Sequence, residues 1–115
     1  MNILFTVKNN ENWNSILDSR FGRTDSFMLY NEENDTLTWH SNDTSNALAH
    51  GAGIQTVQTV ADLKTDIIIT GGGIGPKAME LLKRTAIKLY TQVGEITIKE
   101  AYDNWKNKRY TETNI

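Results

Sequence analysis

The chain has 115 residues, of which 38% are hydrophobic and 23% charged, which fits one globular domain and excludes a disordered or fibrous class. Its 12 Lys and Arg residues against 14 Asp and Glu leave a formal net charge of −2, so the chain has no general attraction to nucleic acid or to an anionic membrane. It contains no cysteine, which excludes disulfides, a thiolate nucleophile and Cys-based zinc or iron–sulfur sites.

Residues 3–7, Ile-Leu-Phe-Thr-Val, predict a first strand that is buried on both faces, because they are rich in β-formers and almost wholly apolar. This run is too short for the apolar part of a signal peptide, and no apolar run reaches the length of a membrane span, so we expect a cytoplasmic protein without membrane contact. Its ordinary composition makes a folded monomer the default expectation. The polar stretch 8–25 predicts a long loop. Its candidate anchors on the body of the domain are Trp13, Ile16, Leu17 and Phe21.

The next two predicted strands, 26–30 and 36–40, form a hairpin, since the polar turn 31–35 separates two short β-rich runs. A polar run then leads toward a predicted helix from about 50 to 64. Its evidence is the helical spacing of four apolar residues, Ile54, Val57, Val60 and Ala61.

Residues 66–70 predict a buried central strand that is broken by a glycine-rich turn, after which Pro76 stands at the first position of a second helix. This helix is expected to bury Ala78, Leu81 and Leu82. Residues 86–90 predict the last strand. Residues 97–100, Thr-Ile-Lys-Glu, match a capping box at the start of a third helix that ends near Lys108.

The predicted elements follow the order βββαβαβα without an internal repeat or a Pro-rich linker. Connections through helices favour parallel strand pairs, so this order predicts a single α/β domain whose mainly parallel sheet carries one hairpin. We place the domain at residues 1–110 and expect residues 111–115 to form a disordered tail.

Three segments are expected to meet outside the carboxyl ends of the strands, where ligands of open α/β sheets bind. They contain the candidate site residues Arg20, Phe21, Gly22 and Arg23; His50, Gly51 and Gly53; and Gly71, Gly72, Gly73 and Gly75. The two arginines offer forked, positively charged donors for an oxyanion or an anionic cluster. The alternative is that each pairs with Asp18 or Asp25 on a solvated loop.

The glycine-rich turn 71–75 allows two interpretations. Its backbone approaches an anion at the positive end of the following helix, or it is a tight turn that needs positive φ. It lacks the ending of a phosphate-binding loop and the spacing of the dinucleotide fingerprint, so nucleotide binding has little support. His50 is a candidate ligand or a plain surface residue, and together with His40 it makes no zinc signature. No catalytic triad or placed carboxylate pair is evident, so we expect a binding protein and not an enzyme.

Three segments carry a family resemblance: Arg20-Phe21-Gly22-Arg23 before a strand, residues 50–55 at the start of a helix, and residues 66–88 around the glycine turn. Their order and spacing resemble those of the dinitrogenase iron-molybdenum cofactor biosynthesis family. This family includes NifX, NifY and the C-terminal part of NifB, and the likeness covers nearly the whole chain. The resemblance implies a ribonuclease H-like α/β fold with a five-stranded mixed sheet in which strand two is antiparallel to the rest. About three helices are expected to accompany the sheet.

The resemblance also implies binding or carriage of the iron-molybdenum cofactor, its precursors or another molybdenum-containing cluster, with cofactor-assembly or acceptor proteins as partners. All these cargoes are anionic metal–sulfur clusters. Nitrogenase-associated members have a histidine before the Phe-Gly pair, where this chain has Arg20. His50 is therefore the candidate metal ligand, and hydrogen bonds and charge are expected to hold most of the cluster. Two alternatives stay open: a metal-free regulatory or scaffold module, and a phosphate-ester or nucleotide binder that uses the turn 71–75.

Overall fold

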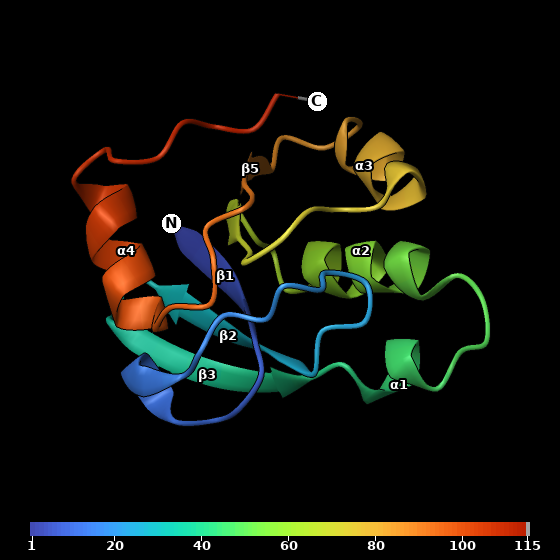
Figure 1. Cartoon of the computed structure of the whole chain (residues 1–115), viewed down its shortest axis with the longest axis horizontal. Coiled ribbons are helices and arrows are strands. Elements are labelled where there is room, and N and C mark those ends of the chain that lie inside the picture. The colour runs from blue at the N-terminus through green and yellow to red at the C-terminus, as the bar shows by residue number, and fades with distance from the viewer. Residues whose placement is uncertain (115) are drawn as a thin grey trace.

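The computed structural model describes residues 1–114 and shows a five-stranded sheet between two layers of helices (Figure 1). The strands are β1 (Asn2–Val7), β2 (Ser26–Asn31), β3 (Thr36–Ser41), β4 (Ile67–Ile69) and β5 (Lys88–Tyr90). The helices are the 3-10 helix η1 (Asn12–Asn14) and the α-helices α1 (Asp43–Asn46), α2 (Ala52–Asp62), α3 (Pro76–Leu82) and α4 (Ile98–Lys106). Helix α4 covers one face of the sheet, and α2 and α3 cover the other.

The sheet has the strand order β3-β2-β1-β4-β5. Strand β2 is antiparallel to β1 and to β3, whereas β1, β4 and β5 pair in parallel, so β2 alone runs against the other strands. The structure thus confirms the predicted α/β class, the five-stranded mixed sheet and the hairpin of β2 and β3. The strand order is compatible with the ribonuclease H-like topology that the resemblance implies.

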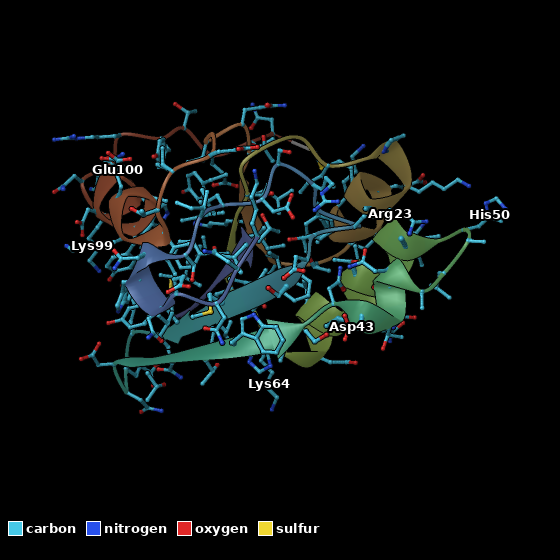
Figure 2. All side chains as sticks on the ribbon, turned by 60° about the horizontal axis from the view of Figure 1, so that its bottom comes forward. Arg23, Asp43, His50, Lys64, Lys99 and Glu100 are labelled. Atoms are coloured by element: carbon cyan, nitrogen blue, oxygen red, sulfur yellow. The ribbon has the colours of Figure 1, made fainter. Side chains whose placement is uncertain are left out.

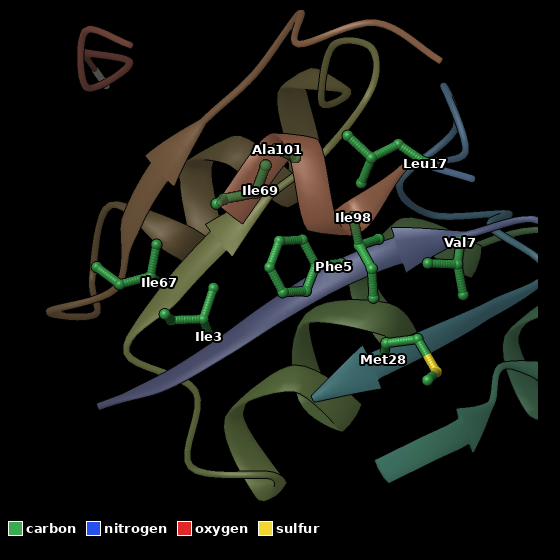
Figure 3. Close-up of a cluster of buried hydrophobic side chains, with 9 residues drawn as sticks. All are labelled: Ile3, Phe5, Val7, Leu17, Met28, Ile67, Ile69, Ile98 and Ala101. Atoms are coloured by element: carbon green, nitrogen blue, oxygen red, sulfur yellow. The ribbon is translucent and has the colours of Figure 1, made fainter. Parts of the chain in front are cut away.

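The sheet separates two hydrophobic clusters, because successive side chains of a strand point to opposite faces. In β1, Ile3, Phe5 and Val7 lie in the cluster beside α4, and Leu4 lies in the cluster beside α2 and α3. The α4 cluster consists of Ile3, Phe5, Val7, Leu17, Met28, Ile67, Ile69, Ile98 and Ala101 (Figure 3). Burial of each large side chain there stabilises the fold by about 1.5–3 kcal/mol. The almost continuous apolar sequences of β1 and β4 follow from this burial on both faces.

The first long helix is shorter than the predicted range of about 50 to 64, and backbone conformation explains both limits. Helix α2 starts at Ala52 because Gly51 before it has a φ of 78°, which glycine adopts without strain and which lies outside the helical region. It ends at Asp62, and Lys64 just beyond it has a φ of 58°.

Residues 1–114 contain four α-helices, where about three were expected. The additional one, α1, is a single polar turn without the apolar spacing from which helices are predicted. Tertiary hydrogen bonds hold it in place. Ser45 is buried, with its Oγ 3.1 Å from Oγ1 of Thr56 in α2, and Asn42 donates from Nδ2 to the carbonyl of Thr24 at 3.1 Å.

The later elements differ from the prediction mainly at their ends. Leu81 of α3 is half-buried where we expected it to be buried, and β5 starts at Lys88 and not at residue 86. The predicted start of α4 is confirmed, because Thr97 is its N-cap and its Oγ1 accepts a hydrogen bond from the N–H of Glu100 at 3.2 Å. The helix ends at Lys106.

The long loop 8–25 is fastened to the domain at several points. Leu17 and Phe21 are buried, as predicted, and isolated bridges pair Val7 with Leu17 and Ile16 with Thr97. This fixes the path of the loop from the end of β1 across the sheet edge.

The segment that we expected to be a disordered tail, residues 111–115, is described up to Asn114. Within it, the N–H of Thr113 donates to the carbonyl of Leu89 at 2.7 Å, and the Thr113 hydroxyl lies 2.8 Å from that of Thr91. These bonds attach the segment to β5, and residue 115 lies outside the described residues. None of the helices in the described part of the chain has the length and apolar character to cross a membrane.

Candidate functional site

A cavity of about 560 Å³ lies where the loop 20–23 meets the N-termini of α2 and α3. Its volume falls in the range of small-molecule sites. Its walls come from segments that follow β1, β3 and β4, at the edge of the sheet where open α/β folds bind their ligands. The lining residues are Arg20, Phe21, Gly22, Arg23, Gly51, Ala52, Gly53, Ile54, Gly75, Pro76, Lys77 and Ala78.

Small residues let the three segments approach each other closely beneath this cavity. A Cβ atom added to Gly22 would lie 2.9 Å from Cα and 3.0 Å from N of Gly53, so the loop and the first turn of α2 are in backbone contact. A Cβ atom added to Gly53 would lie 3.4 Å from Cβ of Ala78 in α3. The glycine of the Arg-Phe-Gly-Arg segment is therefore required by close packing.

Arg20 is anchored by a buried carboxylate. Its Nε and Nη2 donate to Oδ1 and Oδ2 of Asp18 at 3.0 and 2.9 Å, in a forked pair. The Asp18 side chain is 1% exposed and that of Arg20 is 62% exposed, so the guanidinium stands between the protein interior and solvent. Pairing with an aspartate was the alternative to anion binding for Arg20, and the structure contains this pair. The Asp18 carboxylate offsets much of the positive charge of Arg20.

The Asp18 carboxylate also fixes the backbone of the loop. It accepts hydrogen bonds from the N–H groups of Arg20 at 2.9 Å and Asp25 at 3.1 Å. Burial alone would raise the pKa of Asp18, but the hydrogen bonds from Arg20 and Asp25 and the charge of Arg20 outweigh it and hold the pKa below its usual value. Asp18 therefore stays ionised and keeps the loop in place.

Arg23 and Lys77 also line the cavity, and neither of these two cations has a carboxylate partner in the described residues. Nη2 of Arg23 donates to the carbonyls of Leu48 and Ala49 at 2.9 and 3.3 Å, which holds the loop before α2 but leaves the charge of the guanidinium unopposed. Sequence reasoning missed Lys77. The signal was its place directly after Pro76, in the first turn of a helix that begins at this sheet edge.

The starts of α2 and α3 add partial positive charge to the cavity. The N-cap residues are Gly51 and Gly75, and neither makes a side-chain cap hydrogen bond. The first N–H groups of a helix have no partner within the helix, so those of α2 and α3 are available to an acceptor. Among residues 1–114, three cationic and no acidic side chains line the cavity, which therefore suits an anion.

A buried polar network connects the loop to α1 and α2. The carbonyl of Gly22 accepts hydrogen bonds from Oγ1 of Thr56 at 2.7 Å and from Nδ2 of Asn42 at 3.2 Å. The carbonyl of Thr24 accepts from Nδ2 of Asn46 at 2.9 Å. Sequence reasoning missed these positioning residues, because isolated Asn and Thr residues carry no signal until the segments are brought together.

Four of the candidate site residues do not line the cavity: His50, Gly71, Gly72 and Gly73. His50 is exposed and lies at the outer end of the loop between α1 and α2, farther out than Arg23 (Figure 2). Gly71 and Gly72 are buried against the loop before Arg20, where the N–H of Gly71 donates to the carbonyl of Asp18 at 3.1 Å.

The glycine-rich turn is thus explained by crowding. A side chain on Gly72 would collide with the carbonyl oxygen of Ser19, and one on Gly71 would lie 3.0 Å from the carbonyl oxygens of Asp18 and Gly94. Of the two interpretations of this turn, the one that requires positive φ does not hold for residues 71–75, since the described glycines with positive φ are Gly51 and Gly94. Within this turn, Gly75 is the glycine that borders the cavity.

A family model described as dinitrogenase iron-molybdenum cofactor matches residues 1–108. The chain belongs to this family. The structure of this dinitrogenase cofactor family member is similar to that of the apo form of the orange protein from Desulfovibrio gigas, with a TM-score of 0.90 and 26% identity over 97% of this chain and 92% of that one. It is also similar to a putative NifB protein from Thermotoga, with a TM-score of 0.80 and 25% identity over 99% and 96% of the two chains. A search of curated proteins gave no significant match.

For this dinitrogenase cofactor family member, the available donors decide how a metal cluster would be held. Within residues 1–114, no group of three or more His, Cys, Asp or Glu side chains is placed to hold a metal ion, and none of these residue types lines the cavity. Guanidinium, ammonium and N–H groups donate hydrogen bonds and do not ligate metals. The residues present therefore fit a cluster that is bound through its anionic outer atoms.

Proposed function

We propose that this protein binds and carries an anionic metal–sulfur cluster, either the iron-molybdenum cofactor, its precursor or another molybdenum-containing cluster, without catalysing a reaction on it. The observation that carries the proposal is the cavity at the starts of α2 and α3, which is lined by Arg20, Arg23 and Lys77 and by no acidic side chain. Membership of the dinitrogenase iron-molybdenum cofactor family supports this cargo. The likeness to an orange protein described in its apo form supports it as well.

Charge and hydrogen bonds would supply most of the binding free energy. Sulfide or oxide atoms on the surface of a cluster accept charge-assisted hydrogen bonds from Arg23 and Lys77, and further ones from the free N–H groups of α2. Arg20 contributes less charge, since Asp18 already binds its guanidinium. Binding of this kind weakens as salt rises, so the cargo remains exchangeable, which suits a carrier.

Transfer of cargo requires contact with an assembly or acceptor protein, and apolar side chains beside the cavity support such a contact. Ile54 lines the cavity and is 45% exposed. Leu48, whose carbonyl binds Arg23, is 38% exposed. We propose that the partner covers these two side chains while the cluster passes between the proteins.

The test is anaerobic loading with tetrathiomolybdate, a coloured molybdenum–sulfur dianion, followed by gel filtration and visible absorbance of the protein fraction. We expect the unmodified protein to retain colour and the double variant R23A/K77A to lose at least about tenfold in affinity, since each lost charge-assisted hydrogen bond contributes about 1.5–3 kcal/mol. Lys99→Ala is the matched control, because Lys99 lies on α4, away from Arg23 (Figure 2), and should retain colour as the unmodified protein does.

Absence of colour on the unmodified protein, or equal retention by the double variant, would contradict the proposal. His50→Ala separates charge from metal ligation. His50 is exposed and does not line the cavity, so we expect this variant to bind within about twofold of the unmodified protein. A loss as large as that of R23A/K77A would instead identify His50 as a metal ligand.

A further inference from the structure

A second cavity, of about 520 Å³, lies on the α4 side of the sheet, away from the cavity lined by Arg20, Arg23 and Lys77, which we call the cationic cavity. Its walls come from β5, from the C-terminal end of α4 and from the segment that follows this helix. The lining residues are Tyr90, Trp105, Lys106, Lys108 and Tyr110. In the part of the chain that the structure describes, three aromatic rings and two ammonium groups thus surround one hollow, and no acidic side chain lines it.

Neighbouring contacts hold the aromatic walls in position. The ring of Trp105 packs at 6.4 Å from that of Tyr90, nearly at a right angle, and at 5.9 Å from that of Tyr102. The hydroxyl of Tyr110 accepts a hydrogen bond from Nδ2 of Asn104 at 3.0 Å. A ligand that enters between these rings therefore loses little free energy in ordering them.

The segment that carries Tyr110 is fixed at both ends. The N–H of Lys108 donates to the carbonyl of Trp105 at 3.0 Å, directly after the helix. Farther along, Thr113 donates to the carbonyl of Leu89 in β5 at 2.7 Å, so the chain returns beside that strand after it leaves α4 (Figure 1). The cavity is therefore a built feature of the fold between α4 and β5.

The charges around the rings define the ligand. Lys106 is neutralised by Glu32 at 2.9 Å, with its Nζ 5.8 Å from the centre of the Trp105 ring. Lys108 has no ion-pair partner among residues 1–114. Its ammonium group therefore remains available to a ligand anion.

Flat aromatic walls bind a planar aromatic group, and an unopposed ammonium group binds an anion. We propose that this cavity binds a nucleotide, with its base against Trp105 and Tyr110 and its phosphate at Lys108. The volume of the cavity lies within the range of known small-molecule sites. This site is separate from the glycine-rich turn 71–75, whose glycines are packed against the loop before Arg20.

The test uses adenosine 5′-monophosphate as the probe and NMR spectroscopy of the ¹⁵N-labelled protein. We expect saturable shifts of the indole N–H of Trp105, while that of Trp39, exposed on the edge strand β3, stays in place. Adenosine should bind about five- to tenfold more weakly, because it lacks the charge for Lys108, and inorganic phosphate alone should not shift Trp105. Absence of a saturable Trp105 shift up to about 10 mM nucleotide, or equal binding of nucleotide and adenosine, would overturn the proposal.

Variants at the edge of the cavity keep the test independent of the stability of α4. Tyr110→Ala should weaken nucleotide binding about tenfold and Tyr110→Phe only slightly, because the ring carries the stacking. Lys108→Ala should weaken binding of the nucleotide but not of adenosine. Lys77→Ala, in the cationic cavity, should leave nucleotide binding unchanged. Nucleotide binding that is insensitive to both Tyr110→Ala and Lys108→Ala would refute this location.

Discussion

Gly22→Ala tests whether close backbone packing builds the cationic cavity. The added Cβ would lie 2.9 Å from Cα and 3.0 Å from N of Gly53, and neither backbone atom can move without shifting the start of α2. Displacement of the loop instead would strain the hydrogen bonds that the Gly22 carbonyl accepts from Thr56 at 2.7 Å and Asn42 at 3.2 Å. Either route to relief disturbs the walls of the cavity.

The expected cost follows from these two terms. Forced overpacking costs about 1–3 kcal/mol, and weakening of a buried hydrogen bond costs about 1 kcal/mol. We therefore expect Gly22→Ala to lower the free energy of unfolding by about 2–4 kcal/mol, which corresponds to a melting temperature lower by about 10–20 °C in a domain of this size. It should also weaken retention of tetrathiomolybdate, since the start of α2 is displaced.

Gly53→Ala is the matched control for this prediction. Its added Cβ would lie 3.4 Å from Cβ of Ala78, a contact that a small shift relieves, and alanine also favours the helix. We expect its free energy of unfolding, measured by urea denaturation with an unchanged slope, to stay within about 0.5 kcal/mol of the unmodified protein. Equal stability of Gly22→Ala and the unmodified protein would refute the argument from close packing.

Three further variants test the supports of the fold. Asp18→Asn should lower the free energy of unfolding by about 2–3 kcal/mol near pH 7, because an amide places a donor against the donors of Arg20 and Asp25. Burial alone would raise the pKa of Asp18, but the hydrogen bonds from Arg20 and Asp25 hold it below that of an unfolded aspartate. Its stabilisation is therefore fully present above the unfolded pKa and is lost as the pH falls through the lower folded pKa. The difference between Asp18→Asn and the unmodified protein in urea titrations should therefore shrink in acid, and a constant difference would argue against ionised Asp18. Asn42→Ala should cost about 2 kcal/mol, seen as a lower urea midpoint, because the carbonyls of Gly22 and Thr24 lose a buried donor. Thr97→Ala should cost about 1 kcal/mol through loss of the α4 N-cap, and an unchanged melting temperature would contradict that role.

The sequence by itself determined the class of fold, because the signals involved are local. The apolar runs of β1 and β4 reflect burial on both faces of a strand. Interactions within a few residues explain the other signals, which are the polar turn between β2 and β3, Pro76 at the start of α3 and Thr97 at the start of α4. Local backbone conformation also decides where elements end. The positive φ angles of Gly51 and Lys64 at the limits of α2 were not evident from residue type and spacing alone.

Only the tertiary structure decided the composition of the candidate site. It brought Lys77 and Arg23 to the same cavity, paired Arg20 with buried Asp18 and placed Gly22 against Gly53. These arrangements depend on how the loop, α2 and α3 approach one another. The same holds for α1, whose turn is stabilised by hydrogen bonds to other elements and not by apolar spacing. Residue type predicted that the glycines of the turn 71–75 were needed. The reason is the backbone of Asp18, Ser19 and Gly94, which lies far from the turn in sequence but packs against Gly71 and Gly72 in the fold. Contacts of this kind depend on the spatial arrangement of the whole domain, so no local pattern in the sequence specifies them.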